Sequence, residues 1–202
     1  MVTTPSLSIF KRLLFYVVGT VVLLSQSSCG YNTMNELDQK VQAQWANVQN
    51  SYQRRSDLIP NLVNTVKGAA NFEKSTLTQV IEARAKASSV QLSADQLTPE
   101  NIKRFQEAQS QVSAGLGRLL AVSEAYPDLK ANANFQELQA QIEGTENRIN
   151  VERQKFNDVT REYNTYVRSF PNNLFAGIFG FKQKGYFEAD AAAQKAPSVN
   201  FE

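Results

Sequence analysis

Apolar residues recur every three to four positions along most of the chain after residue 33, which is the spacing of one helical face. The alternating pattern of a half-buried β-strand does not occur there. The first stripe predicts a helix from about Thr33 to about Lys67, and Pro60 within it predicts a kink or a fresh helix start. The stripe consists of Leu37, Val41, Trp45, Val48, Tyr52, Ile59, Leu62 and Val66.

Two further helices follow a predicted break at residues 68–71. One is expected from Phe72 to about Ala87, followed by a polar loop. The next is expected to begin at Thr98-Pro99-Glu100, because a capping hydroxyl, a Pro in the first turn and an acid near the positive end of the dipole favour a helix start. It should end or turn at Tyr126-Pro127-Asp128. The segment Gly115-Leu116-Gly117-Arg118 lies inside this helix and predicts a close approach of two helices.

The fourth helix has the most regular pattern, a seam with alternating spacings of three and four that ends before Pro171. Short loops between four such helices favour antiparallel neighbours. We therefore predict an all-α fold, an elongated antiparallel four-helix up-and-down bundle. The seam comprises Phe135, Leu138, Ile142, Thr145, Ile149, Glu152, Phe156, Val159, Tyr163, Tyr166 and Phe170.

The first residues have the pattern of an export signal. Lys11 and Arg12 precede twelve mostly apolar residues, too few to span a bilayer, and small residues then lead to Cys29, the single Cys. This arrangement predicts a lipoprotein-like signal peptide over residues 1–28 with lipidation of Cys29. The alternative is that residues 11–28 remain as an uncleaved anchor. Either version places the protein on a membrane, outside the cytoplasm, with the inner or outer membrane left open.

Charge and composition remove several classes of function. Cleavage would also remove Lys11 and Arg12 and leave equal numbers of acidic and basic residues, so no nucleic-acid partner is expected. The chain contains no His, which excludes His-dependent nucleophilic triads and HExxH zinc sites. We predict no catalytic residue, no metal site and no cofactor.

Several segments together resemble the LemA family. In the first half they include Arg55-Ser56-Asp57-Leu58-Ile59-Pro60-Asn61-Leu62-Val63 and Glu82-Ala83-Arg84. In the second half they include Glu143-Gly144-Thr145-Glu146-Asn147-Arg148-Ile149 and Tyr186-Phe187-Glu188. The resemblance covers about residues 30–202. It implies a bacterial protein with a long four-helix bundle held to a membrane by its N-terminus.

Charged residues inside the predicted helices have two interpretations. Paired carboxylates could serve as acid and base or as a metal site, but crossing Arg–carboxylate pairs that fix the register of a bundle are favoured. Glu152 lies on the apolar seam and predicts a basic partner opposite, with Arg55 or Arg84 as candidates. The predicted structural network comprises Arg55, Asp57, Arg84, Glu146, Arg148 and Glu152.

The C-terminal residues 172–202 are predicted as an aromatic-rich tail that follows a bundle over residues 33–171 and a linker at 29–32. If four helices alternate in direction, the fourth returns toward the membrane and delivers this tail there. The tail is expected to contact a membrane or protein partner, or to cap the open end of the bundle. The candidate contact residues are Leu174, Phe175, Ile178, Phe179, Phe181, Tyr186 and Phe187.

These observations favour a non-enzymatic, membrane-tethered helical scaffold or adaptor of the bacterial envelope. An unidentified envelope protein is the expected partner, and self-association is left open. The alternatives are a module that binds a lipid or apolar ligand in a dry cavity and, third, an envelope hydrolase.

Overall fold

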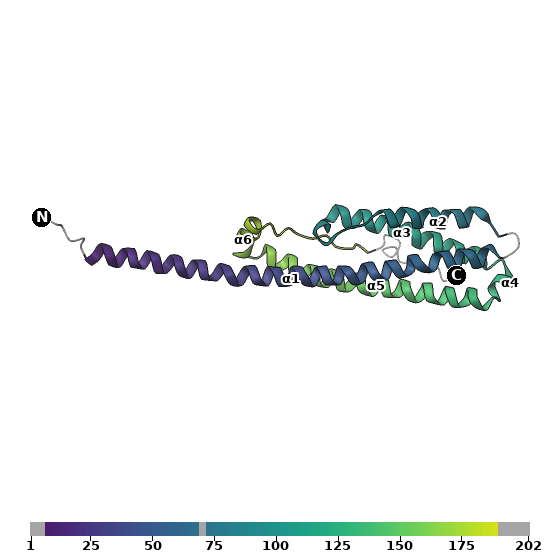
Figure 1. Cartoon of the computed structure of the whole chain (residues 1–202), viewed down its shortest axis with the longest axis horizontal. Coiled ribbons are helices and arrows are strands. Elements are labelled where there is room, and N and C mark those ends of the chain that lie inside the picture. Colours follow the sequence, from purple (N-terminus) through teal and green to yellow (C-terminus); the bar gives the residue numbers. More distant parts are fainter. Residues whose placement is uncertain (1–6, 69–71, 190–202) are drawn as a thin grey trace, which may run out of the picture. The chain divides into compact units, whose positions relative to one another are not determined.

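The computed structural model describes residues 7–68 and 72–189, and every regular element in this part of the chain is a helix (Figure 1). The prediction of an all-α protein is therefore confirmed. The elements are α1 (Leu7–Lys67), α2 (Lys74–Ser89), the short 3-10 helix η1 (Ala94–Gln96), α3 (Pro99–Ser123), α4 (Pro127–Lys130), α5 (Ala133–Arg168) and α6 (Asn172–Phe179).

Helix α1 is longer than the sequence pattern predicts. It begins at Leu7, so the expected start near Thr33 is wrong. No Pro lies between these two residues, and the Leu- and Val-rich stretch between them has side chains that a helix accommodates. It also runs without interruption through Pro60, where a fresh start was one expectation. No helix among the described residues is long and apolar enough to cross a membrane.

Parts of the predicted N- and C-terminal segments lie outside the described residues. Residues 1–6 and 190–202 are not described, and within α1 the side chains of residues 7–11, 13 and 17–29 are not described either. The predicted signal-peptide cleavage and the predicted lipidation of Cys29 therefore stay predictions. The same holds for residues 69–71 of the predicted break.

The starts and stops of α2 to α4 follow local chemistry. The Thr98 hydroxyl accepts the Asn101 N–H at 3.3 Å with Pro99 at the first helical position, as predicted. Helix α2 begins at Lys74, later than expected, and Phe72 instead packs on the Tyr126 ring with centroids 4.9 Å apart. The one-turn helix α4 and η1 were not predicted, because each is shorter than a periodic pattern can reveal.

The chain divides into two compact units, which are described separately. The first combines the chain up to Lys40 with Glu162–Gln183, and the second combines Val41–Arg161 with the chain from Lys184 onward. The second unit has an apolar core to which α1, α2, α3, α4 and α5 all contribute. A Cβ on Gly115 would lie 3.4 Å from Val80 Cγ2, so α2 and α3 approach closely there as predicted, whereas a Cβ on Gly117 would meet nothing within 4 Å.

The seam of α5 faces inward over most of its length. Of its eleven positions, Phe135, Ile142, Ile149 and Phe156 are among the most deeply buried apolar residues. Phe170 is the exception, with 82% of its surface exposed, because the helix ends at Arg168 and the periodic pattern no longer sets the direction of the side chain. The predicted seam is thus correct within the helix and wrong beyond its end.

The first unit has a small core of its own. Met34 and Leu37 of α1 are buried, as are Tyr163 and Val167 of α5 and Ala176 of α6. The Tyr163 hydroxyl donates a 2.9 Å hydrogen bond to the Lys182 carbonyl, which fixes the chain after α6. Burial raises the pKa of this hydroxyl well above its ordinary value.

Candidate functional site

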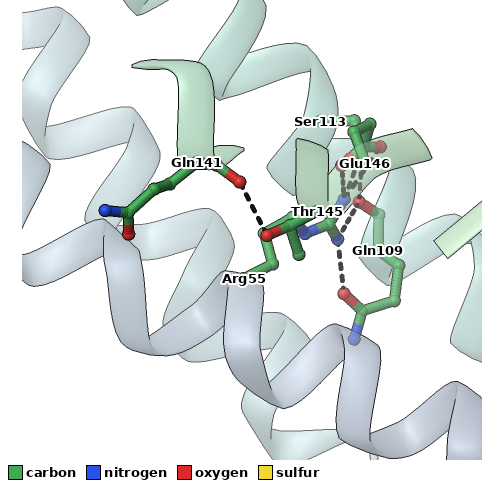
Figure 2. Close-up of polar contacts among 6 residues, drawn as sticks. All are labelled: Arg55, Gln109, Ser113, Gln141, Thr145 and Glu146. Atoms are coloured by element: carbon green, nitrogen blue, oxygen red, sulfur yellow. Dashed lines mark hydrogen bonds and ion pairs between the residues drawn. The ribbon is translucent and has the colours of Figure 1, made fainter. Parts of the chain in front are cut away.

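A buried arginine links three helices in the second unit (Figure 2). Arg55 of α1 is 1% exposed, and its Nη1 donates to Glu146 Oε2 of α5 at 2.8 Å and to Ser113 Oγ of α3 at 2.7 Å. Its Nη2 donates to Gln109 Oε1 at 2.7 Å. The Ser113 hydroxyl in turn donates to Glu146 Oε1 at 2.8 Å. The guanidinium is therefore neutralised by one carboxylate and held by two further groups.

The hydrogen bonds and the ion pair of this network join α1, α3 and α5 to one another. Arg55, Glu146 and Ser113 are hydrogen-bonded to one another, and the buried Thr145 hydroxyl beside them donates to the Gln141 carbonyl at 2.7 Å (Figure 2). The structure brings together Arg55 and Glu146 of the predicted set. Sequence reasoning missed Gln109 and Ser113, whose only signal was their spacing of four residues on one helix face.

Arg84 of α2 compensates for the proline inside α1. Pro60 has no N–H, so the carbonyl of Ser56, four residues earlier, loses its helical hydrogen bond. The Arg84 Nε donates to this oxygen at 2.9 Å. This contact explains how α1 continues through Pro60, and it joins two segments on which the family resemblance rests.

Glu152 is buried, but its predicted partner is wrong. Neither Arg55 nor Arg84 reaches it; instead Gln44 Nε2 of α1 donates to Glu152 Oε2 at 2.8 Å. The hydrogen bond from Gln44 lowers the carboxyl pKa from its ordinary value, assisted by Lys155 at 3.2 Å and Arg148 at 3.6 Å, while burial opposes the shift. The predicted partner was wrong because the sequence pattern does not determine the register of α1 against α5.

The register of α1 against α5 follows from these two contacts. Residue 44 of α1 meets residue 152 of α5, and residue 55 meets residue 146. The two helices therefore run in opposite directions in this unit. This register places the Arg55 guanidinium beside the Glu146 carboxylate rather than beside Glu152. A periodic pattern identifies which face of a helix is buried but not which residue of another helix lies opposite.

The other two members of the predicted network lie at the surface. Asp57 is exposed and accepts a 2.7 Å hydrogen bond from Gln53 one turn before it. Arg148 has a 73% exposed side chain, and its Nε lies 3.6 Å from Glu152 Oε1. The single predicted network thus divides into the Arg55–Glu146 pair, in which Arg55 is buried and the Glu146 side chain is 35% exposed, the Arg84–Ser56 contact, a separate Glu152 contact and two surface residues.

Three hollows in the second unit are open grooves with mixed linings. The first, of about 220 Å³, lies between α1, α2 and α3 and is lined by Arg55 and Arg84 together with several glutamines. The second and third, of about 560 and 480 Å³, are lined mainly by polar side chains. None of these three resembles the dry apolar cavity expected of a lipid-binding module. Across the described residues, no three carboxylate or cysteine side chains are grouped as a metal site would require.

The first unit exposes large apolar side chains on α6. Leu174, Ile178 and Phe179 are 58%, 76% and 48% exposed, and we refer to them as the apolar surface. The Phe179 ring lies 5.0 Å from the ring of Tyr31, and Phe181 lies 5.8 Å from the same ring. The apolar surface therefore lies beside the part of α1 that directly follows Cys29. Phe175 and Phe181 are half-buried.

The remaining two tail candidates lie in the second unit, and one of them is not a surface residue. Phe187 is 4% exposed and its ring packs among Trp45, Phe105 and Phe156, with centroids 5.4 to 6.4 Å apart. Tyr186 beside it is 42% exposed. The expectation that Phe187 contacts a partner or membrane is wrong, because the aromatic pocket covers it.

Comparisons with known proteins agree with the family resemblance. A family model described as LemA family matches residues 44–201. Magnetosome protein MamQ 2 of Paramagnetospirillum magneticum is 26% identical over 193 residues, which cover 87% of this chain and 71% of the relative. Protein LemA of Metamycoplasma hominis is 27% identical over 142 residues, which cover 70% of this chain and 61% of the relative. The chain belongs to the LemA family.

Proposed function

We propose that this protein is a non-enzymatic, membrane-tethered scaffold of the bacterial envelope, in which an up-and-down helical bundle is held by its N-terminus and rests on the membrane through α6. The observation that supports this most is the position of the apolar surface. Its side chains are exposed to solvent beside Tyr31, two residues after the predicted lipidation site at Cys29. A tether at that point would hold the apolar surface within reach of the bilayer.

The energetics favour such a contact. Full burial of a Leu, Ile or Phe side chain is worth about 1.5–3 kcal/mol, and large apolar side chains gathered on a short helix are costly to leave in water. Partial insertion of three such side chains would add to the tether without making an anchor by itself.

The polar centres of the second unit support the non-enzymatic part of the proposal. The Glu146 carboxylate is engaged by Arg55 and Ser113, and the Glu152 carboxylate by Gln44 and Lys155. The two carboxylates belong to separate contacts rather than to one solvent-open cleft. Such fully paired groups stiffen a bundle, which is what a scaffold requires.

The tether is tested by intact mass. The full chain is isolated from its native membrane as wild type and as Cys29→Ser. Loss of residues 1–28 with added acyl mass in the wild type, absent in the variant, supports lipid tethering. An unprocessed N-terminus that remains with the membrane replaces the lipid by an uncleaved anchor, and a chain that is released by washing contradicts tethering altogether.

The contact is tested by placing a photo-crosslinking amino acid at Ile178 of the full chain in native membranes. Val151, which is 48% exposed on α5 in the second unit, provides the matched control position. We expect lipid adducts from position 178 and none from 151. Protein adducts at 178 would show that the apolar surface docks a partner instead, and the absence of any adduct would contradict both forms of the proposal.

A further inference from the structure

The chain places a short extended segment across the second unit. Residues 184–188, here called the strap, alternate in burial: Gly185 and Phe187 face inward, whereas Tyr186 and Glu188 face solvent. This alternation with a period of two is that of an extended strand. The strap is thus held like a bound peptide rather than as part of a helix.

Two side-chain amides form hydrogen bonds with the backbone of the strap at Phe187 and Glu188. Asn157 of α5 accepts the Phe187 N–H at 2.9 Å and donates to the Phe187 carbonyl at 2.8 Å. Gln106 of α3 does the same at Glu188, with 3.0 Å and 2.9 Å. Each amide therefore imitates the paired hydrogen bonds that a neighbouring β-strand would make.

Two inward positions give the groove its sequence selectivity. The Phe187 ring fills a pocket formed by Trp45, Phe105 and Phe156, and the Arg153 guanidinium lies 5.1 Å from the ring centroid. Two residues earlier, the Gly185 N–H donates to the Leu97 carbonyl at 2.8 Å.

The glycine position is restricted by backbone rather than by flexible side chains. A Cβ on Gly185 would lie 2.7 Å from Pro99 Cα and 2.9 Å from the Thr98 carbonyl oxygen. Backbone atoms at the start of α3 cannot move aside at low cost. The groove accordingly accommodates glycine at the first inward position and a large aromatic residue at the second.

We infer that this groove is a recognition site for an extended Gly-x-Phe segment, and that a second copy of this chain can fill it with its own strap in place of the strap of the same chain. The groove is built from α1, α3 and α5, and its contacts to the strap include the Phe187 ring, hydrogen bonds to the strap backbone and a 3.3 Å hydrogen bond from Lys184 Nζ to the Ala94 carbonyl. None of these contacts depends on the strap being joined to the same chain. Exchange of an identical element between protomers is a low-cost route to a dimer.

The sole tryptophan reports on occupation of the groove. The Trp45 ring stacks on Phe187 with an interplanar angle of 21° and a centroid distance of 6.2 Å, and its Nε1 donates to the Leu92 carbonyl. Removal of the Phe187 ring would open one face of the indole to water. The emission maximum of Trp45 should therefore move to longer wavelength when the groove empties and return when it fills.

The first experiment supplies the segment as a peptide. The full chain with Gly185→Ala and Phe187→Ala has an intact groove and a strap that cannot seat. Addition of a peptide of sequence Gln-Lys-Gly-Tyr-Phe-Glu-Ala should restore the wild-type emission with saturation. A peptide with Ala for the Phe, and one with Ala for the Gly, should each bind at least about tenfold more weakly. Equal responses to all three peptides, or none to any, would overturn the recognition site.

The second experiment supplies the segment from another copy. The partner chain carries Trp45→Phe, so that it is silent, and Asn157→Ala, which weakens its own groove while leaving its strap unchanged. Mixing it with the strap-deficient chain should restore Trp45 emission and yield a dimer by analytical ultracentrifugation. Restoration by peptide but not by the second copy would overturn the strap exchange and leave only the recognition site.

Two controls keep the result interpretable. Gly177→Ala is a matched glycine change, because a Cβ there meets nothing within 4 Å, and it should leave Trp45 emission unchanged. If the strap-deficient chain loses its helical circular dichroism, the wild-type chain with a peptide carrying fluorinated Phe serves instead. A shifted fluorine resonance that the unlabelled peptide reverses supports the site, and an unshifted resonance contradicts it.

Discussion

The two units of the chain differ in which energetically costly placement of side chains they contain: buried charged groups in the second unit and exposed apolar groups in the first. The second unit encloses charge at Arg55 and at Glu152, and supplies each with hydrogen-bond partners from other helices. The first unit exposes apolar side chains, in Leu174 and Ile178, with nothing described that covers them. A buried charge with all its partners present indicates a structural role, whereas an uncovered apolar surface indicates a contact made outside the chain.

The largest effect is expected from Glu146→Ala. Removal of this carboxylate leaves the Arg55 guanidinium 1% exposed and without a counter-charge. We expect the free energy of unfolding to fall by about 3–5 kcal/mol, measured by urea denaturation. The matched control is Asp158→Ala, whose exposed pair with Arg161 should contribute less than about 1 kcal/mol. Equal effects of the two substitutions would contradict a buried, stabilising centre.

Substitution of two phenylalanines of the C-terminal segment, one in each unit, tests the same comparison between buried and exposed side chains. Phe187→Ala empties an aromatic pocket and should cost about 3 kcal/mol in unfolding free energy. Phe179→Ala removes a half-exposed ring and should cost about 1 kcal/mol or less. The order should reverse when membrane contact of α6 is measured, where only Phe179→Ala weakens it. Comparable losses of stability would show that the apolar surface is a structural cap.

The Arg84 contact can be isolated by a double-mutant cycle with Pro60. Arg84→Met leaves the Ser56 carbonyl without a donor and should cost about 1–3 kcal/mol. In a Pro60→Ala background, the new N–H at residue 60 can donate to the same carbonyl, so Arg84→Met should cost measurably less. The cost is read from chemical denaturation of all four chains. An unchanged cost would mean that Arg84 stabilises the protein by another route.

The smallest expected effect concerns how the free energy of unfolding falls at acidic pH. Because the pKa of Glu152 is lower in the folded chain than its ordinary value, its contribution is fully present above about pH 5 and is lost as the pH falls through the folded pKa. Glu152→Gln should therefore show a shallower loss of unfolding free energy between about pH 5 and pH 3. Parallel profiles for the two chains would contradict the assigned role of the Gln44 hydrogen bond.

The sequence was informative wherever a short-range rule applies. Period and capping residues identified the helix around Thr98 and the buried seam of α5, and Arg55 was correctly expected to pair across helices. The start of α1 was missed because nothing in the local sequence forbids helix before Thr33. The partner of Glu152 and the burial of Phe187 were missed because both depend on which residues of distant segments come to lie opposite one another.

Contact between the apolar surface and the membrane is the central feature of the proposed function. Phe179→Trp and, as a control, Val151→Trp are each placed in a full chain carrying Trp45→Phe, and each protein is reconstituted into vesicles containing brominated phospholipids. We expect bromine to quench the tryptophan at position 179 strongly and the one at 151 weakly or not at all. Equal and negligible quenching at both positions would contradict the proposed membrane contact of the first unit.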